Sequence, residues 1–153
     1  QAMQRGMAVL AWSPLGGGLL TGKYRQSREG RLSDWGRLVH TETDAQKTAI
    51  VDAVIDIAEQ TGRTPAQVAT AWVRERGRRL ATAGIPIIGP RRLAQLEDYL
   101  AALTLDLTAE QYDRLDEISR IDLGIPHQAN ANALDGLQGG LSASFDTSTI
   151  PVA

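Results

Sequence analysis

Two short apolar runs, separated by helical patterns, constrain the fold of this chain more than any other feature. Residues 7–12 (MAVLAW) form an uninterrupted apolar run, which is typical of a strand buried on both faces in a parallel sheet. A second run, residues 85–88 (IPII), follows Gly84 and ends at Gly89. Because strands that alternate with helices are joined by crossover connections, the two runs are expected to lie parallel. The sequence therefore predicts an α/β fold.

Four helices are predicted from capping patterns and apolar spacing. Three of them open with a threonine and a glutamine three residues later, the pattern of a capping box, at Thr43 and Gln46, Thr64 and Gln67, and Thr108 and Gln111. Gly62 and Gly77 are expected to end the first two helices, and leucines at 93, 96, 100 and 103 mark the third. Residues 13–42 are expected to form a long loop, and the chain from Asp122 onward an irregular tail.

Two strands alone do not form a sheet whose faces and edges are all covered. The 153 residues match the size of one domain, but they open on an apparent helix end and on a residue other than methionine. We therefore expect the C-terminal portion of a larger α/β protein. The alternative is a short phosphate-binding domain complete in itself, which would leave two buried strands without neighbours.

Composition excludes several kinds of site. The chain has no cysteine, which rules out disulfides and thiolate chemistry, and only His40 and His127 are available to a histidine metal centre. The net charge of −2 offers no general attraction for nucleic acid. The charge is uneven, however, because residues 1–40 carry +4 and residues 101–153 carry −6. An anionic ligand would therefore be attracted to the first block, although chance clustering on solvated surfaces is the alternative.

The glycine-rich segment after the first strand is a candidate phosphate-binding loop. Its glycines permit close approach of backbone N–H groups to an anion, and its flanking cations are Lys23, Arg25, Arg28 and Arg31. Residues 17–23 match the start of a P-loop, but Tyr24 stands where that motif needs a hydroxyl for magnesium. A Rossmann fingerprint fails as well, because it requires glycine at the position of Thr21. A turn whose glycines serve only backbone geometry remains the alternative.

A second loop favours the phosphate interpretation. Residues 89–92 (GPRR) directly follow the second strand and precede a helix. Ligands of parallel α/β folds bind at this end of the strands, and arginine suits bidentate contact with phosphate. Two such loops, one after each strand, are able to hold one ligand with phosphates at two places.

These segments resemble the aldo-keto reductases. Residues 12–24 (WSPLGGGLLTGKY) are similar to the loop after strand seven of that family, and residues 87–98 (IIGPRRLAQLED) to its segment after strand eight. Residues 64–69 (TPAQVA) lie between them as in the family. The resemblance covers about residues 1–128 and leaves 129–153 as an irregular C-terminal tail. It implies the C-terminal part of a (β/α)8 TIM barrel, about strands seven and eight with their helices.

The resemblance also implies NADP(H) bound in an extended form without a Rossmann fold. Trp12 is expected to stack on the nicotinamide ring. The pyrophosphate would be lined by Ser13, Pro14, Leu15, Gly16 and Gly17. Lys23 and Arg31 would fold over the cofactor.

The adenosine half of the cofactor is expected at the second loop. Gly89 would allow close approach, Arg91 would meet the 2′-phosphate, and Gln95 and Asp98 would address the adenosine. Tyr99 departs from the family, which commonly has an asparagine that reaches the adenine. A tyrosine lacks the donor and acceptor pair of an amide, but its ring is able to pack on a base.

The function implied by the resemblance is reduction of aldehydes or ketones to alcohols with NADP(H). The family's general acid is a tyrosine tuned by lysine, aspartate and histidine on earlier strands, so no catalytic residue and no metal ligand is assigned here, and the isolated chain is expected to be inactive. The alternative is a nucleotide-sensing regulatory subunit similar to potassium channel beta subunits. The expected partner is a small carbonyl compound, without nucleic acid or membrane, in the cytoplasm, and the oligomeric state stays open.

Overall fold

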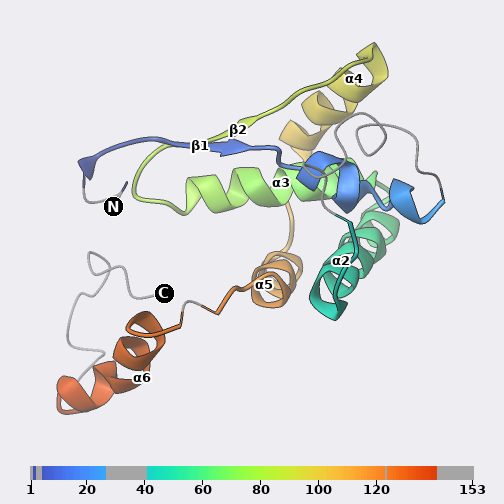
Figure 1. Ribbon diagram of the computed structural model, residues 1–153. Coiled ribbons are helices and arrows are strands. Elements are labelled where there is room, and N and C mark those ends of the chain that lie inside the picture. The colour runs from blue at the N-terminus through green and yellow to red at the C-terminus, as the bar shows by residue number, and fades with distance from the viewer. Residues whose placement is uncertain (1, 3–4, 27–40, 123, 141–153) are drawn as a thin grey trace. The chain divides into compact units, whose positions relative to one another are not determined.

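The computed structural model describes residues 2, 5–26, 41–122 and 124–140. The chain is an α/β structure that divides into two compact units, Gln1–Ser119 and Arg120–Ala153 (Figure 1). Within the ranges described, no helix combines the length and apolar character that crossing a membrane requires.

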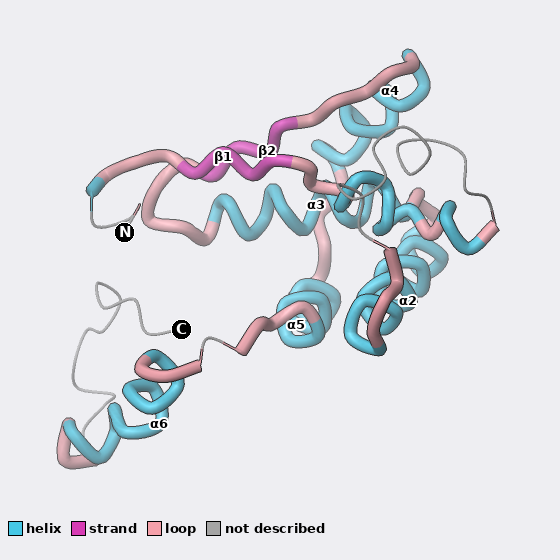
Figure 2. The backbone as a smooth tube through the Cα atoms, in the orientation of Figure 1, coloured by secondary structure: helices cyan, strands magenta, loops and turns pink. Residues whose placement is uncertain are grey.

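The sheet of the first unit consists of two parallel strands. Strand β1 (Val9–Trp12) lies beside β2 (Gly84–Ile87) (Figure 2). In the register of this pair, Val9 lies opposite Gly84 and Trp12 opposite Ile87. The predicted parallel pairing is confirmed. Both strands therefore end at the same edge of the sheet, and the two glycine-containing loops leave from that edge together.

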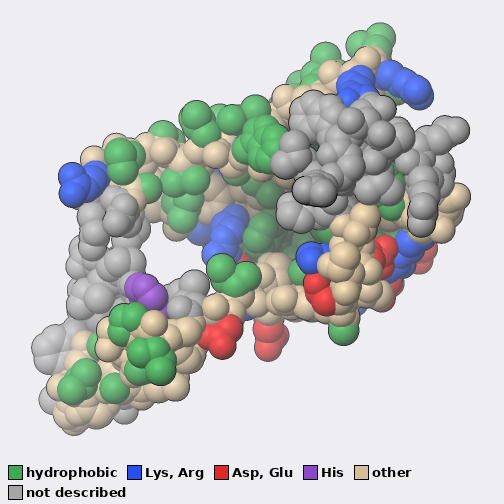
Figure 3. All heavy atoms as spheres, in the orientation of Figure 1, with side chains coloured by type: hydrophobic (Ala, Val, Ile, Leu, Met, Phe, Trp, Pro, Cys, Tyr) green, Lys and Arg blue, Asp and Glu red, His purple; other side chains and the backbone are tan. Residues whose placement is uncertain are grey.

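The prediction that the first strand is buried on both faces is wrong for this chain. Leu10 is 61% exposed and Ile85 is 48% exposed. Helix α3 (Pro65–Arg78) packs along β2, but among the described residues the sheet holds only β1 and β2. An apolar strand is buried only where other elements cover it, and hydrophobic side chains accordingly lie at the surface along the strands (Figure 3).

The loop expected over residues 13–42 is partly helical. Two 3₁₀ segments, η2 (Gly16–Thr21) and η3 (Lys23–Arg25), occupy its first part. Gly17 and Gly18 have φ values of 70° and 108° and interrupt η2. Residues that carry a Cβ rarely adopt this backbone conformation. Residues 27–40, including Arg28, Arg31 and His40, lie outside the described residues.

The residue that caps helix α2 (Ala45–Thr61) lies one position later than expected. The Asp44 carboxylate accepts a hydrogen bond from the Lys47 backbone at 2.8 Å, so Asp44 and not Thr43 caps the helix. The expected partner Gln46 instead donates to the Ile118 carbonyl at 3.1 Å. Gly62 ends the helix with a φ of 63°, as predicted.

Helix α3 begins as predicted but does not end at Gly77. Thr64 and Gln67 form both halves of the capping box, with Pro65 in the first turn. Gly77 lies inside the helix and faces Gly84 of β2, where an added Cβ would come within 2.8 Å of the Gly84 carbonyl oxygen. The glycine therefore permits close approach of helix and strand rather than ending the helix.

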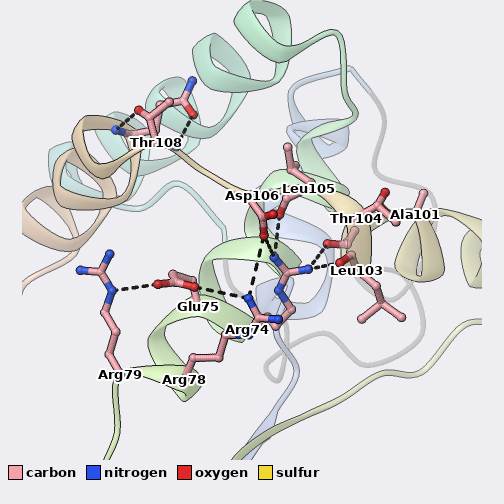
Figure 4. A network of polar contacts seen from close by, with 12 residues as sticks. Arg74, Glu75, Arg78, Arg79, Ala101, Leu103, Thr104, Leu105, Asp106 and Thr108 are labelled. Atoms are coloured by element: carbon pink, nitrogen blue, oxygen red, sulfur yellow. Dashed lines mark hydrogen bonds and ion pairs between the residues drawn. The ribbon is translucent and has the colours of Figure 1, made fainter.

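Two further helices complete the first unit. Helix α4 (Leu93–Ala101) continues into η5 (Ala102–Thr104), and α5 (Ala109–Ile118) opens with the predicted Thr108–Gln111 capping box. Arg74 of α3 donates to the carbonyl oxygens of Ala102 at 3.0 Å and Leu105 at 2.8 Å, and to that of Leu103 (Figure 4). This one side chain therefore joins α3 to the segment between α4 and α5.

The core lies where α2, α3 and α5 meet. Its largest fully buried side chains are Val51, Ile57 and Val68. The main cluster consists of Ala53, Val54, Ile57, Ala58, Val68, Ala69, Ala71, Leu105 and Leu115. These residues belong to the first unit, so the core that supports the sheet edge is formed before residue 120.

The tail expected to be irregular contains a helix. In the second unit, α6 (His127–Leu137) includes three alanines and two leucines, which are strong helix formers. Asn130, Asn132 and Gly136 lower the helix propensity of this segment, so its sequence pattern does not indicate a helix. Residues 141–153 of the expected tail lie outside the described residues.

Candidate functional site

A cavity of about 650 Å³ opens at the edge of the sheet where β1 and β2 end. One part of its wall is the segment from Trp12 to Lys23, and a second part is the segment from Ile87 to Arg92. Helix α4 contributes Gln95, Asp98 and Tyr99, and α3 contributes Ala66. Segments more than 60 residues apart therefore form one concave site.

Most of the residues expected at the cofactor line this cavity. They are Trp12, Ser13, Pro14, Leu15, Gly17, Lys23, Gly89, Arg91, Gln95, Asp98 and Tyr99. Gly16 lies in the first turn of η2 and is not part of the wall, and Arg31 falls outside the described residues.

Six lining residues were given no individual role from the sequence, although Gly18 and Arg92 belong to the two loops predicted to bind phosphate. They are Gly18, Thr21, Ala66, Ile87, Ile88 and Arg92. Five of them stand within the two segments that resemble the family, so position in those segments is the signal that would have found them. Only the tertiary structure brings Ala66 to the site, because it depends on how the start of α3 packs beside α4.

The first loop is held in shape by its own hydrogen bonds. Ser13 has a φ of 57°, and its Oγ accepts from the Gly17 N–H at 3.0 Å while its carbonyl accepts from the Gly16 N–H at 2.8 Å. The Tyr24 hydroxyl donates to the Gly17 carbonyl at 2.8 Å. A positive φ at a residue with a Cβ is uncommon, and the surrounding bonds keep Ser13 there.

Lys23 reaches the cavity across Gly18. A Cβ at Gly18 would lie 2.7 Å from Lys23 Cε, so the glycine makes room for the lysine side chain. The Lys23 ammonium lies 4.9 Å from the centre of the Tyr24 ring, within the range of a cation–π contact. Gly18 and Tyr24 thus position the Lys23 ammonium group in the cavity wall.

Arg25, which the sequence suggested as one of the cations flanking a phosphate-binding loop, instead forms ion pairs within the protein. Its Nε and Nη2 donate to the two carboxylate oxygens of Glu42 at 2.8 and 2.7 Å, and Nη2 also lies 2.7 Å from Asp52. These carboxylates raise the pKa of Arg25, and the Arg25 guanidinium lowers the pKa of Glu42. Arg25 therefore joins η3 to α2, and its charge is balanced there.

The second loop is braced by Gln95. The Gln95 side-chain oxygen accepts from the Arg91 N–H at 2.7 Å, one turn before it. Arg92 is the N-cap residue of α4, and both arginines line the cavity together with Lys23. Three cations and one carboxylate, Asp98, therefore stand in a single wall, which favours an anionic ligand.

Asp98 connects the wall to the start of α3. Its Oδ1 accepts from Gln67 Nε2 at 2.8 Å and from Thr64 Oγ1 at 3.3 Å. Thr64 and Gln67 are the two members of the capping box, and Gln67 is buried. One oxygen of the Asp98 carboxylate, which was expected to contact adenosine, therefore accepts hydrogen bonds from the protein itself.

Aromatic rings and cations together define what the cavity is able to bind. Trp12, at the end of β1, is 67% exposed, and Tyr99 enters the wall from α4. Planar rings of a ligand are able to pack on such side chains, and its phosphates are able to meet Lys23 and the two arginines. The residues present fit a dinucleotide, with the backbone of the glycine turn close to the same space.

Comparison with known proteins identifies the family. A model of the aldo/keto reductase family matches residues 1–120. The chain belongs to the aldo/keto reductase family. The match ends beside the boundary between the two compact units, at Ser119, whereas the sequence interpretation extended the resemblance to about residue 128.

Individual aldo/keto reductase relatives cover most of this chain but only part of their own length. The chain is 36% identical over 118 residues to the uncharacterized oxidoreductase YrpG of Bacillus subtilis, which covers 76% of this chain and 33% of that protein. It is 30% identical over 133 residues to the aldo-keto reductase str7 of Strobilurus tenacellus, with 85% and 38% covered. It is 29% identical over 154 residues to the aldo-keto reductase ausK of Aspergillus calidoustus, with 97% and 36% covered. The chain thus spans about a third of the length of these relatives.

Proposed function

We propose that this chain is the NADP(H)-binding portion of an aldo-keto reductase that reduces aldehydes or ketones to alcohols. The observation that carries the proposal is the cavity at the end of β1 and β2, whose wall contains Trp12, Lys23, Arg91 and Tyr99. In this proposal the chain is about strands seven and eight, with their helices, of a (β/α)8 barrel. A cytoplasmic location stays a prediction.

The roles within the cavity follow from the chemistry of each side chain. Trp12 packs on the nicotinamide ring, and the pyrophosphate lies against the turn from Ser13 to Gly17, where Lys23 balances its charge. Gly89 allows the adenosine half to approach, and Arg91 pairs with the 2′-phosphate, which selects NADP(H) over NAD(H).

When bound, the cofactor supplies the hydride that a carbonyl carbon accepts. This chain binds and orients the cofactor, and the proton donor of the reaction belongs to an earlier part of the barrel. The 153-residue chain alone is accordingly expected to bind NADPH without turning over an aldehyde. Joined to the coding sequence upstream of Gln1, it is expected to oxidise NADPH in the presence of one.

Fluorescence of Trp12 tests the binding. NADPH is expected to quench the emission of the wild-type chain and to leave that of Trp12→Phe nearly unchanged, which separates Trp12 from Trp35 and Trp72.

The Arg91→Ala substitution tests the specificity for the 2′-phosphate. It is expected to weaken the binding of NADP⁺ about tenfold and that of NAD⁺ little, since a charged hydrogen bond contributes about 1.5–3 kcal/mol. Calorimetry that detects no heat of binding with either dinucleotide would overturn the proposal.

A further inference from the structure

The peptide group between Gly17 and Gly18, in the turn at the cavity, is held at both of its ends. Its carbonyl oxygen accepts a hydrogen bond from the Tyr24 hydroxyl at 2.8 Å, and its N–H donates to the Leu15 carbonyl at 2.9 Å. Both glycines have a positive φ, and a peptide between two glycines meets few steric barriers to rotation. The two hydrogen bonds therefore determine which way this peptide points.

The side chain of Lys23 contacts the same tyrosine. Lys23 is exposed and lines the cavity, and a lysine side chain has many rotamers when nothing constrains it. Its ammonium lies 4.9 Å from the centre of the Tyr24 ring, whose face attracts a cation. Lys23 Nζ and the Tyr24 hydroxyl oxygen each lie 3.2 Å from the point where a Cβ of Gly18 would stand. The room that Gly18 leaves is therefore where the cation and the hydroxyl meet.

Tyr24 influences the cavity through its neighbours. Among the described residues, the wall includes Gly17, Gly18 and Lys23 but not the half-buried Tyr24. The hydroxyl of Tyr24 contacts the glycine peptide, and its ring contacts the lysine. The two parts of one side chain therefore act on two different parts of the wall, and substitutions are able to remove them separately.

We propose that Tyr24 is a positioning residue for the part of the cavity that binds the pyrophosphate. Its hydroxyl fixes the peptide between Gly17 and Gly18, and its ring fixes the Lys23 ammonium. This inference rests on the proposed function. Because NADP⁺ and NAD⁺ carry the same pyrophosphate, Tyr24 contributes equally to the binding of both, whereas Arg91 contributes to that of NADP⁺ alone.

Single substitutions of Tyr24 in the 153-residue chain test the two contacts, with calorimetry of NADP⁺ and NAD⁺ as the measurement. Tyr24→Phe keeps the ring and loses the hydroxyl, and it is expected to weaken both dinucleotides about fivefold, the effect of one neutral hydrogen bond. Tyr24→Leu also loses the ring and is expected to weaken both about fifteenfold, since an exposed cation–π contact adds about threefold. Tyr112→Phe, the same loss of a hydroxyl on α5, is the matched control and is expected to bind as the wild type does.

A double substitution tests whether the ring acts through Lys23. Lys23→Met removes the charge and keeps an unbranched side chain, so the ring then has no cation to position. In that background Tyr24→Leu is expected to weaken binding only about fivefold, as Tyr24→Phe does in the wild type. An undiminished fifteenfold effect would show that the ring does not act through the lysine, which contradicts the inference.

Two results with the single variants would also overturn the inference. One is a loss in Tyr24→Phe or Tyr24→Leu that is confined to NADP⁺, because that pattern places the effect at the 2′-phosphate. The other is a Tyr24→Leu chain that binds both dinucleotides as tightly as the wild type.

NMR of the ligand-free chain separates this inference from the proposed function. The carbonyl carbon signal of Gly17 is expected to move upfield in Tyr24→Phe, because the carbonyl loses a hydrogen bond, and to stay unchanged in Tyr112→Phe. If the wild-type chain binds neither dinucleotide, the proposed function is wrong, and this signal alone decides whether Tyr24 holds the turn. An unchanged Gly17 signal in Tyr24→Phe would contradict the positioning role.

Discussion

At the scale of single residues, a pair of glycines determines how closely α3 approaches the sheet. A Cβ at Gly84 would lie 2.5 Å from the Gly77 Cα, and a Cβ at Gly77 would lie 2.8 Å from the Gly84 carbonyl oxygen. Both obstacles are backbone atoms, which are unable to rotate away as a side chain would. The absence of side chains here is therefore a packing requirement.

Gly77→Ala tests this requirement. Alanine favours a helix, but the clash is expected to dominate and to lower the free energy of unfolding by about 1–3 kcal/mol, as measured by urea denaturation. Gly136→Ala in α6, where an added Cβ meets nothing within 4 Å, is the matched control and is expected to leave the stability unchanged or slightly higher. A Gly77→Ala chain as stable as the wild type would show that the backbones separate at little cost.

The ion pair of Arg25 with Glu42 predicts a pH dependence. Arg25 lowers the pKa of Glu42 below its usual value of 4.5, so the pair stabilises the folded state fully above that value. The stabilisation is lost as the pH falls through the lower pKa of the folded state. The stability difference between wild type and Glu42→Gln is expected to be about 1 kcal/mol or less at neutral pH and to disappear once the pH falls below the lowered pKa of Glu42.

Urea denaturation at several pH values measures that difference. Glu97→Gln, which removes an exposed carboxylate from α4, serves as its control and is expected to show no such trend. A Glu42→Gln difference that stays constant between neutral and acidic pH would mean that the pair does not carry the effect.

At the scale of elements, the capping residues decide where the helices begin. The boxes at Thr64 and Thr108 could be predicted because threonine and glutamine stand at the right spacing with no rival acceptor beside them. Thr43 has Asp44 next to it, and both are good caps, so local sequence alone does not choose between them. The Gln46 side chain, which would complete a box with Thr43, instead donates to the carbonyl of Ile118 in α5, and Asp44 caps the helix.

The two threonine caps are expected to differ in their effect on the cavity. Thr64→Ala and Thr108→Ala each remove one capping acceptor and are both expected to cost about 1 kcal/mol in urea denaturation. Only Thr64 also donates to Asp98, so only Thr64→Ala is expected to weaken NADP⁺ binding, about threefold. Equal binding by the two variants would mean that this hydrogen bond does not influence the cavity.

At the scale of the whole molecule, the core and the cavity both belong to the first compact unit. The cluster of buried residues ends at Leu115, and the cavity wall ends at Tyr99. The unit itself extends to Ser119, where the family match also stops within one residue. All residues of this core cluster and of this cavity wall therefore belong to the first unit.

Two truncations test this division. A chain that ends at Ser119 is expected to keep the urea midpoint and the NADP⁺ affinity of the full chain. A chain that ends at Leu107 loses α5 with its buried Tyr112 and Leu115, and it is expected to lose about 3 kcal/mol or more. If the chain that ends at Ser119 also fails to fold, residues beyond 119 contribute to the stability of the first unit.

The local features of this chain could be predicted from its sequence. The apolar run before Trp12, the positive-φ glycines, the two threonine capping boxes and the arginine pair after β2 are short-range patterns, and the structure contains each of them. The order of strands and helices is sufficient to predict parallel pairing, because a crossover connection brings the second strand back in the same direction.

Contacts between residues that lie far apart in the chain could not be predicted from local patterns. Asp98 meets Gln67 across 31 positions, and Arg25 meets Glu42 across 17, so neither pairing is visible in a local pattern. The exposure of Leu10 could not be predicted from the sequence either, since an apolar residue is buried only where another element covers it. The residue types indicate an anionic ligand with planar rings, and the tertiary contacts determine which side chains line the cavity that would bind it.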